Sequence, residues 1–167
     1  MQGIKLVADG DVISFMFKGT SLGDAYTELI DSRQTGITLL AVSESRQGVV
    51  YGNWGVRKLE ELDAFLSNFI LLESNAEIAN LCGSLLGRCK QIGRALSWPD
   101  AWAAATAMWL DVPLVTHDRD LEKVPGLRVL TVHEHWEVRE EGIGDRMGGP
   151  LWLGERSPEY QRSDARW

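Results

Sequence analysis

Short apolar runs alternate with longer segments of helical periodicity along most of the chain. Apolar residues recur every three or four positions in segments that predict helices, at 23–32, 56–69, 76–92 and 97–110. The runs between them are short and apolar, and they predict buried strands at 4–8, 37–42, 70–72, 112–116 and 127–132. Strands that alternate with helices favour a doubly wound sheet with mostly parallel strands and right-handed crossovers. The pattern therefore predicts an α/β fold.

The clearest helix start lies at Ser97. Its hydroxyl can accept hydrogen bonds from the free amides of a first helical turn, and Pro99 suits that turn because its missing donor is not needed there. Asp100 then sits at the positive end of the helix. The small residues from Ala103 to Ala107 let the helix lie close to a sheet, so we expect the Asp100 carboxylate near the sheet edge.

Three further acids follow predicted strands. Asp9, Asp118 and Glu44 each come just after one of these strands, and Ser43 is the predicted cap of a helix that begins at Glu44. In an open parallel sheet, ligands bind at the carboxyl ends of the strands, where the strand order switches. We therefore expect these three acids and Asp100 to converge at one edge of the sheet.

Carboxylates that converge repel one another. Two of them about 5 Å apart, at an effective dielectric constant near 20, repel by roughly 3 kcal/mol, so a cluster is costly without a positive ion. A ligand set made only of oxygen atoms suggests Mg²⁺ or Mn²⁺. Such an ion can lower the pKa of a bound water, orient that water in line with a phosphodiester and neutralise charge on the transition-state oxygens. The pattern therefore favours hydrolysis of a nucleic-acid strand.

The predicted site has four metal ligands, one of which accepts the proton of the attacking water: Asp9, Glu44, Asp100 and Asp118. Three neighbours are assigned supporting roles: Asp11, Thr116 and Asp120. Asp120 is also an alternative to Asp118 as the fourth ligand. The competing interpretation is that each acid is only a helix cap or a solvated turn residue. A tryptophan set could either stack on bases or pack a core: Trp98, Trp102 and Trp109.

Bulk composition fits this interpretation and narrows the partners. A chain of 167 residues with 44% hydrophobic and 25% charged residues suits one globular domain with a sizeable core. No apolar run approaches the roughly 20 residues of a membrane-spanning helix, and the N-terminus lacks the apolar centre of a signal peptide. We therefore expect a cytoplasmic protein with no membrane partner. Cys82 and Cys89 lie in a helical pattern that puts both on one face, which predicts buried structural thiols.

The charge balance limits how nucleic acid could be bound. The net charge is −7, from 17 basic and 24 acidic residues. This balance gives no broad attraction to nucleic acid, which normally requires basic patches. Any polyanion must therefore be held locally, by arginines or by a metal.

Beyond residue 132, glycine and proline break the periodicity, and acids and arginines dominate. We therefore divide the chain into a domain at 1–132 and a partly irregular C-terminal appendage at 133–167. Trp136, Trp152 and Trp167 make the appendage too apolar for an inert tail, so it would fold back on the domain or pack against another chain. The alternative is a disordered segment with a few apolar residues.

The local sequences around the acids resemble the PIN domain family and, within it, the VapC-type toxins of toxin–antitoxin modules. Asp9 closes a matching opening strand, and Glu44 is followed four residues later by Gly48, as in that family. The third acid stands in the segment Asp100–Ala107, and the fourth in the segment Leu114–Leu121. These last two segments, at their spacing, are the most specific part of the resemblance.

The resemblance covers about residues 4 to 132 and implies a compact three-layer α/β/α domain. It further implies a Mg²⁺ or Mn²⁺ site on the four acids, endoribonuclease activity on RNA, an antitoxin that holds the activity in check, and homodimers. The chain departs from the family at Asp11, where Ser or Asn is usual, and at Ser45, where an apolar residue is common. Asp11 would add a fifth carboxylate to the site. The appendage also exceeds the compact toxin pattern.

Two other functions stay open at this point. The run Asp9–Val12 also resembles the opening motif of haloacid-dehalogenase-type phosphatases, in which the first Asp is a nucleophile. That family needs a Lys before a late acidic motif, and residues 112–117 contain none. A catalytically inactive PIN fold would serve only as a binding module, although the presence of all four acids argues against this function.

Overall fold

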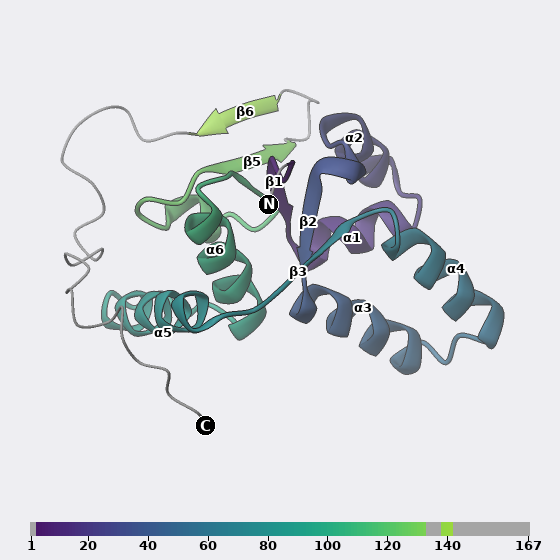
Figure 1. Cartoon of the computed structure of the whole chain (residues 1–167), viewed down its shortest axis with the longest axis horizontal. Coiled ribbons are helices and arrows are strands. Elements are labelled where there is room, and N and C mark those ends of the chain that lie inside the picture. The colour runs from purple at the N-terminus through teal and green to yellow at the C-terminus, as the bar shows by residue number, and fades with distance from the viewer. Residues whose placement is uncertain (1–2, 133–137, 142–167) are drawn as a thin grey trace.

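The computed structural model of the protein describes residues 3–132 and 138–141, which form a six-stranded sheet with helices on both faces (Figure 1). The strand order is β3-β2-β1-β4-β5-β6, with β1 to β5 parallel to their neighbours and β6 antiparallel to β5. The strands are β1 Leu6–Ala8, β2 Thr35–Thr38, β3 Ile70–Leu72, β4 Leu114–Val115, β5 Val129–Val132 and β6 Val138–Glu141. The predicted α/β fold with a mostly parallel sheet is confirmed.

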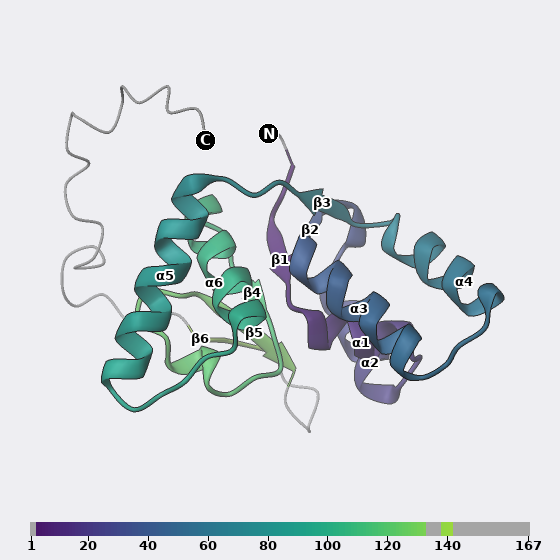
Figure 2. The ribbon, with the colours of Figure 1, turned by 90° about the horizontal axis from the view of Figure 1, so that it is seen from below.

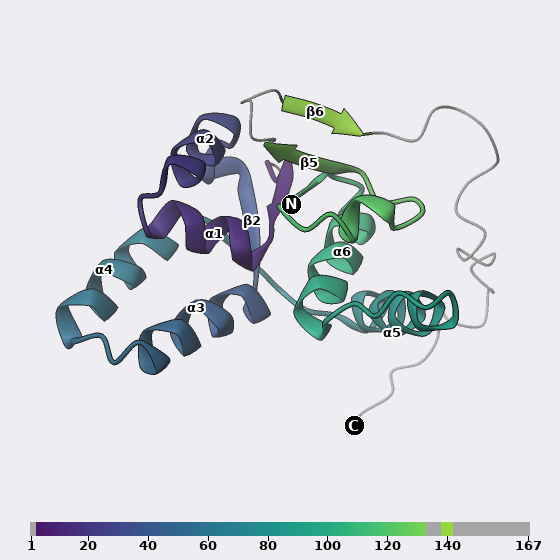
Figure 3. The same cartoon turned by 180° about the vertical axis from the view of Figure 1, so that it is seen from behind.

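The helices divide between the two faces of the sheet. In the described part of the chain they are α1 Gly10–Phe17, α2 Ser21–Leu29, α3 Leu39–Tyr51, α4 Val56–Leu66, α5 Ala76–Gln91 and α6 Trp98–Leu110. Two short 3₁₀ turns are η1 Ser32–Gln34 and η2 Leu121–Lys123. Helices α5 and α6 pack together on one side, and α1 and α2 cover the other (Figure 2). Helices α3 and α4 lie beside α1 (Figure 3).

Alternate residues of the central strands contribute to two separate cores. Val7 and Leu114 pack with α5 and α6, whereas Ala8 and Val115 pack with α1 and α2, and all four are fully buried. Burial on both faces explains why these strands are continuous apolar runs in the sequence. The two cysteines of α5 are buried and free in the first core, which confirms the predicted structural thiols.

The strand predicted at 37–42 is wrong in its second half. β2 ends at Thr38, whose hydroxyl accepts a hydrogen bond from the amide of Ala41 at 3.1 Å and caps α3. The apolar residues that follow Thr38 therefore form the first turn of a helix. Ser43 is not a cap, and Glu44 lies in the second turn of α3 instead of directly past a strand.

The other predicted helices and strands are present, with ends that shift by a few residues, and the apolar run at 12–17 belongs to α1. Strand β6 falls within the segment that the sequence assigns to the appendage. It pairs with β5 so that Val138 stands opposite Val132, and the sheet therefore continues past residue 132. The three tryptophans of the appendage lie outside the described residues. None of the described helices is long and apolar enough to cross a membrane.

Candidate active site

Asp9 lies at the carboxyl end of β1 and caps the N-terminus of α1. Its Oδ1 accepts a hydrogen bond from the amide of Gly10 at 2.7 Å, and its Oδ2 accepts one from Oγ1 of Thr116 at 2.8 Å. Only 3% of the residue is exposed. The pKa of Asp9 is raised to about 6, first by burial and also by the charges of Asp100 and Asp11, which together outweigh the two hydrogen bonds. The ionised form of Asp9 is therefore less favourable in these surroundings than in water.

Thr116 connects the ends of β1 and β4. These strands are parallel neighbours with Ala8 opposite Val115, so the residues that follow them lie side by side. The Thr116 hydroxyl donates to Asp9 and accepts a hydrogen bond from the amide of Asp118 at 3.1 Å. Thr116 therefore orients Asp9 and fixes the loop that carries Asp118.

Asp100 is carried by the first turn of α6. Ser97 caps this helix, as predicted, accepting a hydrogen bond from the Asp100 amide at 3.2 Å and donating one to its Oδ2 at 2.6 Å. Pro99 lies in the same turn. The alanines of α6 are buried, and the helix contacts β1 and β4. This close packing brings the charge of Asp100 near enough to raise the pKa of Asp9.

Glu44 reaches the site from the second turn of α3. Its Oε2 lies 2.6 Å from the point where a Cβ on Gly10 would stand, so its carboxyl group rests against the start of α1. The residue as a whole is exposed, but its pKa is raised to about 7, first by partial removal of the carboxyl group from water and then by Asp9, Asp100 and Asp11. A helix face, and not a strand end, therefore brings this acid to the others.

Asp11, which departs from the family pattern, belongs to the same group of acids. It lies in the first turn of α1. Burial raises its pKa, the charges of Asp100 and Asp118 raise it further, and His117 and Lys18 lower it. The fifth carboxylate expected from the sequence thus shares the electrostatic environment of the site.

Asp118 and Asp120 differ in their surroundings. The charge of Asp118 acts on Asp11, and its Oδ1 accepts a hydrogen bond from the Asp120 amide at 2.8 Å. Asp120 is exposed, and its carboxylate pairs with Lys123 at 2.9 Å, which lowers the pKa of Asp120. The structure therefore brings Asp118 to the other acids and leaves the Asp120 carboxylate outside the group.

The assembled acids form an all-oxygen donor set: Asp9, Asp11, Glu44, Asp100 and Asp118. Within residues 3–132 and 138–141, no three Asp, Glu, His or Cys side chains converge closely enough to hold a metal ion together. Mg²⁺ does not require three such side chains, because it typically takes one or two carboxylates and keeps several waters. The charges that most affect Asp9 and Glu44 are all negative, so a hard divalent cation fits the chemistry of the site.

Comparison with known protein families decides what kind of domain this is. The family described as the PIN domain matches residues 6–127. The chain belongs to the PIN domain family. The resemblance predicted from the sequence is therefore confirmed. No curated protein sequence matches the chain.

Solved structures of VapBC proteins share the fold of this PIN domain. VapBC2 from Rickettsia felis, bound to a DNA fragment from its promoter, matches with a TM-score of 0.67 and 19% identity, over 77% of this chain and 98% of that one. DNA-bound VapBC from Salmonella typhimurium matches with a TM-score of 0.64 and 20% identity, over 77% of this chain and 98% of that one. VapBC-5 from Mycobacterium tuberculosis, a member of the VapBC family of toxin–antitoxin systems, matches with a TM-score of 0.55 and 23% identity, over 74% of this chain and 94% of that one. At these identities the likeness shows a shared fold.

A buried tyrosine of this PIN domain contacts the residues that follow β4 at the site. Tyr26 of α2 is fully buried, and its hydroxyl lies 3.1 Å from the Thr116 carbonyl, 2.9 Å from Nδ1 of His117 and 3.2 Å from Oγ1 of Thr131. Because a carbonyl oxygen only accepts, the Tyr26 hydroxyl donates to Thr116 and fixes the end of β4. In the sequence, Tyr26 is one apolar position of the helix predicted at 23–32. Only its hydroxyl group, which needs a hydrogen-bond partner when buried, could have indicated a contact with the site.

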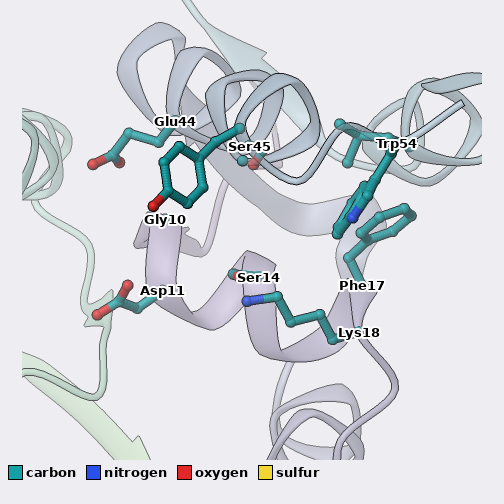
Figure 4. A pocket seen from close by; sticks show the side chains of 11 residues that line it. Gly10, Asp11, Ser14, Phe17, Lys18, Glu44, Ser45 and Trp54 are labelled. Carbon is teal, nitrogen blue, oxygen red and sulfur yellow. The ribbon is translucent and has the colours of Figure 1, made fainter. Parts of the chain in front are cut away.

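A cleft of about 320 Å³ opens beside the acids, between α1 and α3. Figure 4 shows Asp11 and Glu44 at one end of this cleft, and Phe17 packed against Trp54 at the other. It is lined by Gly10, Asp11, Ser14, Phe17, Lys18, Glu44, Ser45, Gly48, Tyr51, Trp54 and Leu62. Tyr51 and Trp54 were not predictable from the sequence as cleft residues, because Tyr51 is the last residue of α3 and Trp54 follows the helix, where no periodic pattern marks them.

The tryptophans that the sequence offered for stacking have other surroundings. Trp102 and Trp109 are partly buried against the core between α5 and α6, which favours the packing alternative for both. Trp98 is 65% exposed at the start of α6.

Proposed function

We propose that this PIN domain is an endoribonuclease that depends on Mg²⁺ or Mn²⁺ and acts as the toxin of a toxin–antitoxin pair. The observation that carries the proposal is the buried carboxylate of Asp9, whose pKa is raised to about 6 beside other acids. An ionised carboxylate in such surroundings becomes favourable when a cation joins it. Membership of the PIN domain family and likeness to VapBC structures support the same function.

The residues of the site divide the work of hydrolysis. The metal would be held, directly or through water, by the predicted ligands: Asp9, Glu44, Asp100 and Asp118. When bound, it would neutralise charge on the phosphodiester oxygens and make water a better nucleophile. Glu44 would accept the proton of the attacking water, because its carboxyl group lies at the cleft beside the other acids. Thr116 keeps Asp9 oriented through its hydrogen bond.

The test is cleavage of a mixed RNA pool by the full-length chain with Mg²⁺, with Mn²⁺ or with EDTA. We expect cleavage only with metal, and sequencing of the product ends would give the sequence preference. Asp100→Asn should slow cleavage by roughly 100-fold or more. Asp120→Asn is the matched control and should stay active, because the Asp120 carboxylate pairs with Lys123 outside the acid group. Cleavage that persists in EDTA, or that Asp100→Asn leaves unchanged, would contradict the proposal.

An antitoxin partner and a homodimer are part of the same proposal. The similar structure from Klebsiella pneumoniae is a toxin–antitoxin complex, which supports a protein partner for this chain. A chain that binds an antitoxin but cleaves no RNA with either metal would instead be an inactive binding module. Membership of the PIN domain family argues against the phosphatase alternative.

A further inference from the structure

We propose that the cleft between α1 and α3 is a nucleobase subsite, which stacks one base of the RNA strand while the adjoining phosphate lies at the acids. The proposal rests on the ribonuclease function given above. Asp11 and Glu44 line the cleft and also belong to the acid group. A strand whose phosphate lies at the acids therefore has a neighbouring nucleoside beside the cleft opening.

The size and lining of the cleft fit one base. Its volume of about 320 Å³ lies at the lower end of the roughly 300–1,000 Å³ of small-molecule pockets, which suits a nucleoside better than a peptide helix. Phe17 and Trp54 close one end with ring centroids 5.9 Å apart and with the Lys58 ammonium over both rings, so the aromatic face open to a base is that of Tyr51, which is 94% exposed at the lining. Aromatic faces stack on any base, and each stacked base is worth roughly 5- to 150-fold in affinity.

The charges of the chain favour stacking as the source of affinity. A net charge of −7 gives no general attraction to RNA, so local contacts must supply the binding. Lys18 is the one cationic side chain of the lining, and within the described part of the chain it forms no ion pair. Its ammonium group is thus available to a phosphate or a base carbonyl.

Gly48 keeps this cleft open. It lies inside α3, where glycine weakens a helix, and a Cβ at this position would meet no atom within 4 Å. Because Gly48 lines the cleft, a larger side chain there would extend into the space proposed for the base. Gly87 is a matched position on α5, since a Cβ there also meets nothing and the residue is outside the cleft lining.

The test measures RNA binding by the full-length chain with Mg²⁺, in an Asp100→Asn background that slows cleavage. The probes are a fluorescein-labelled oligoadenosine hexamer and the same ribose-phosphate hexamer without bases. We expect the intact hexamer to bind at least 5-fold tighter than the abasic one. Adding Gly48→Leu should weaken binding of the intact hexamer by at least 5-fold and leave binding of the abasic hexamer unchanged. Gly87→Leu should change the binding of neither hexamer. Thermal melts should show both leucine variants at least as stable as their parent, because each replaces a glycine inside a helix.

Tyr51→Ala is a second variant that cannot disturb the core, because the side chain is 94% exposed. It should also weaken the intact hexamer selectively. The subsite is overturned if the two hexamers bind equally tightly or if neither binds. It is also overturned if Gly48→Leu weakens the binding of both hexamers alike or of neither. The cleft would then suit an apolar segment of a partner protein. Cleavage of the RNA pool by the wild-type chain tests the ribonuclease function separately, so metal-dependent cleavage without base-selective binding would reject the subsite alone.

Discussion

Burial outweighs hydrogen bonding at Asp9. The Gly10 amide and the Thr116 hydroxyl both favour its ionised form, yet its pKa rises from 3.8 to about 6. The folded protein therefore binds this proton more tightly than the unfolded chain does. The stability that Asp9 contributes is fully present below its pKa in the unfolded chain. This contribution, about 3 kcal/mol in total, is lost as the pH rises through its pKa in the folded protein.

Asp9→Asn should remove this pH dependence. With EDTA present, the wild-type free energy of unfolding should fall between pH 4 and pH 7.5 by about 2.4 kcal/mol more than that of Asp9→Asn. Urea unfolding at the two pH values measures the difference. Asp120→Asn is the control and should keep the wild-type dependence, because the pKa of Asp120 is lowered by Lys123. Equal pH dependence in Asp9→Asn and wild type would show that Asp9 titrates normally.

Some site residues were predictable from the sequence because their positions have local signals. The end of β1 marks Asp9, and the Ser97 cap marks Asp100. Other assignments depend on contacts across the fold. Asp120 differs from Asp118 because it pairs with Lys123, and Tyr26 matters because its hydroxyl meets a strand end far along the chain.

At the scale of elements, the start of α3 decides where Glu44 lies. The apolar run at 37–42 fits either a buried strand or the first turn of a helix by periodicity alone. The hydrogen bond from the Ala41 amide to the Thr38 hydroxyl favours the helix. The sequence therefore predicted Glu44 as a site residue but placed it on the wrong kind of element.

Gly10→Ala tests the contact between α1 and α3. The new Cβ would lie 2.6 Å from Oε2 of Glu44, at the far end of a flexible side chain, so the carboxyl group would move while the helices stay packed. We expect a melting temperature within about 4 °C of wild type and RNA cleavage slowed by roughly 10-fold or more. Gly83→Ala on α5 is the control, because a Cβ there meets nothing. Full activity in Gly10→Ala would show that the position of Glu44 does not matter for cleavage.

For the molecule as a whole, the acids come from elements that sit far apart in the chain. They stand on the end of β1, on α1, on α3, on α6 and on the loop after β4. A cation bound among them would therefore connect both faces of the sheet. Alternating strands and helices made this architecture predictable, whereas β6 was not, because its antiparallel pairing with β5 has no local periodic signal.

Metal binding should consequently stabilise the entire domain. Mg²⁺ at about 100 times its dissociation constant should raise the free energy of unfolding by about 2.7 kcal/mol. For a chain of this size, that corresponds to a rise in melting temperature of about 5–10 °C. Thermal melts at pH 7.5 with MgCl₂, against NaCl of equal ionic strength, measure the effect. The melting temperature of Asp100→Asn should rise less with MgCl₂ than that of wild type. Equal rises in the two proteins would show that the ion binds away from Asp100.

The pairing of β6 with β5 makes β6 the edge strand on one side of the sheet. In the described part of the chain, β3 lies at the opposite margin and pairs only with β2, and its Leu71 is 53% exposed. Unpaired backbone amides and carbonyls at such a margin act as a template for a strand from another polypeptide. If two copies of this chain join through strand addition at β3, the new ladder forms along Ile70–Leu72, at the edge of the sheet opposite β6.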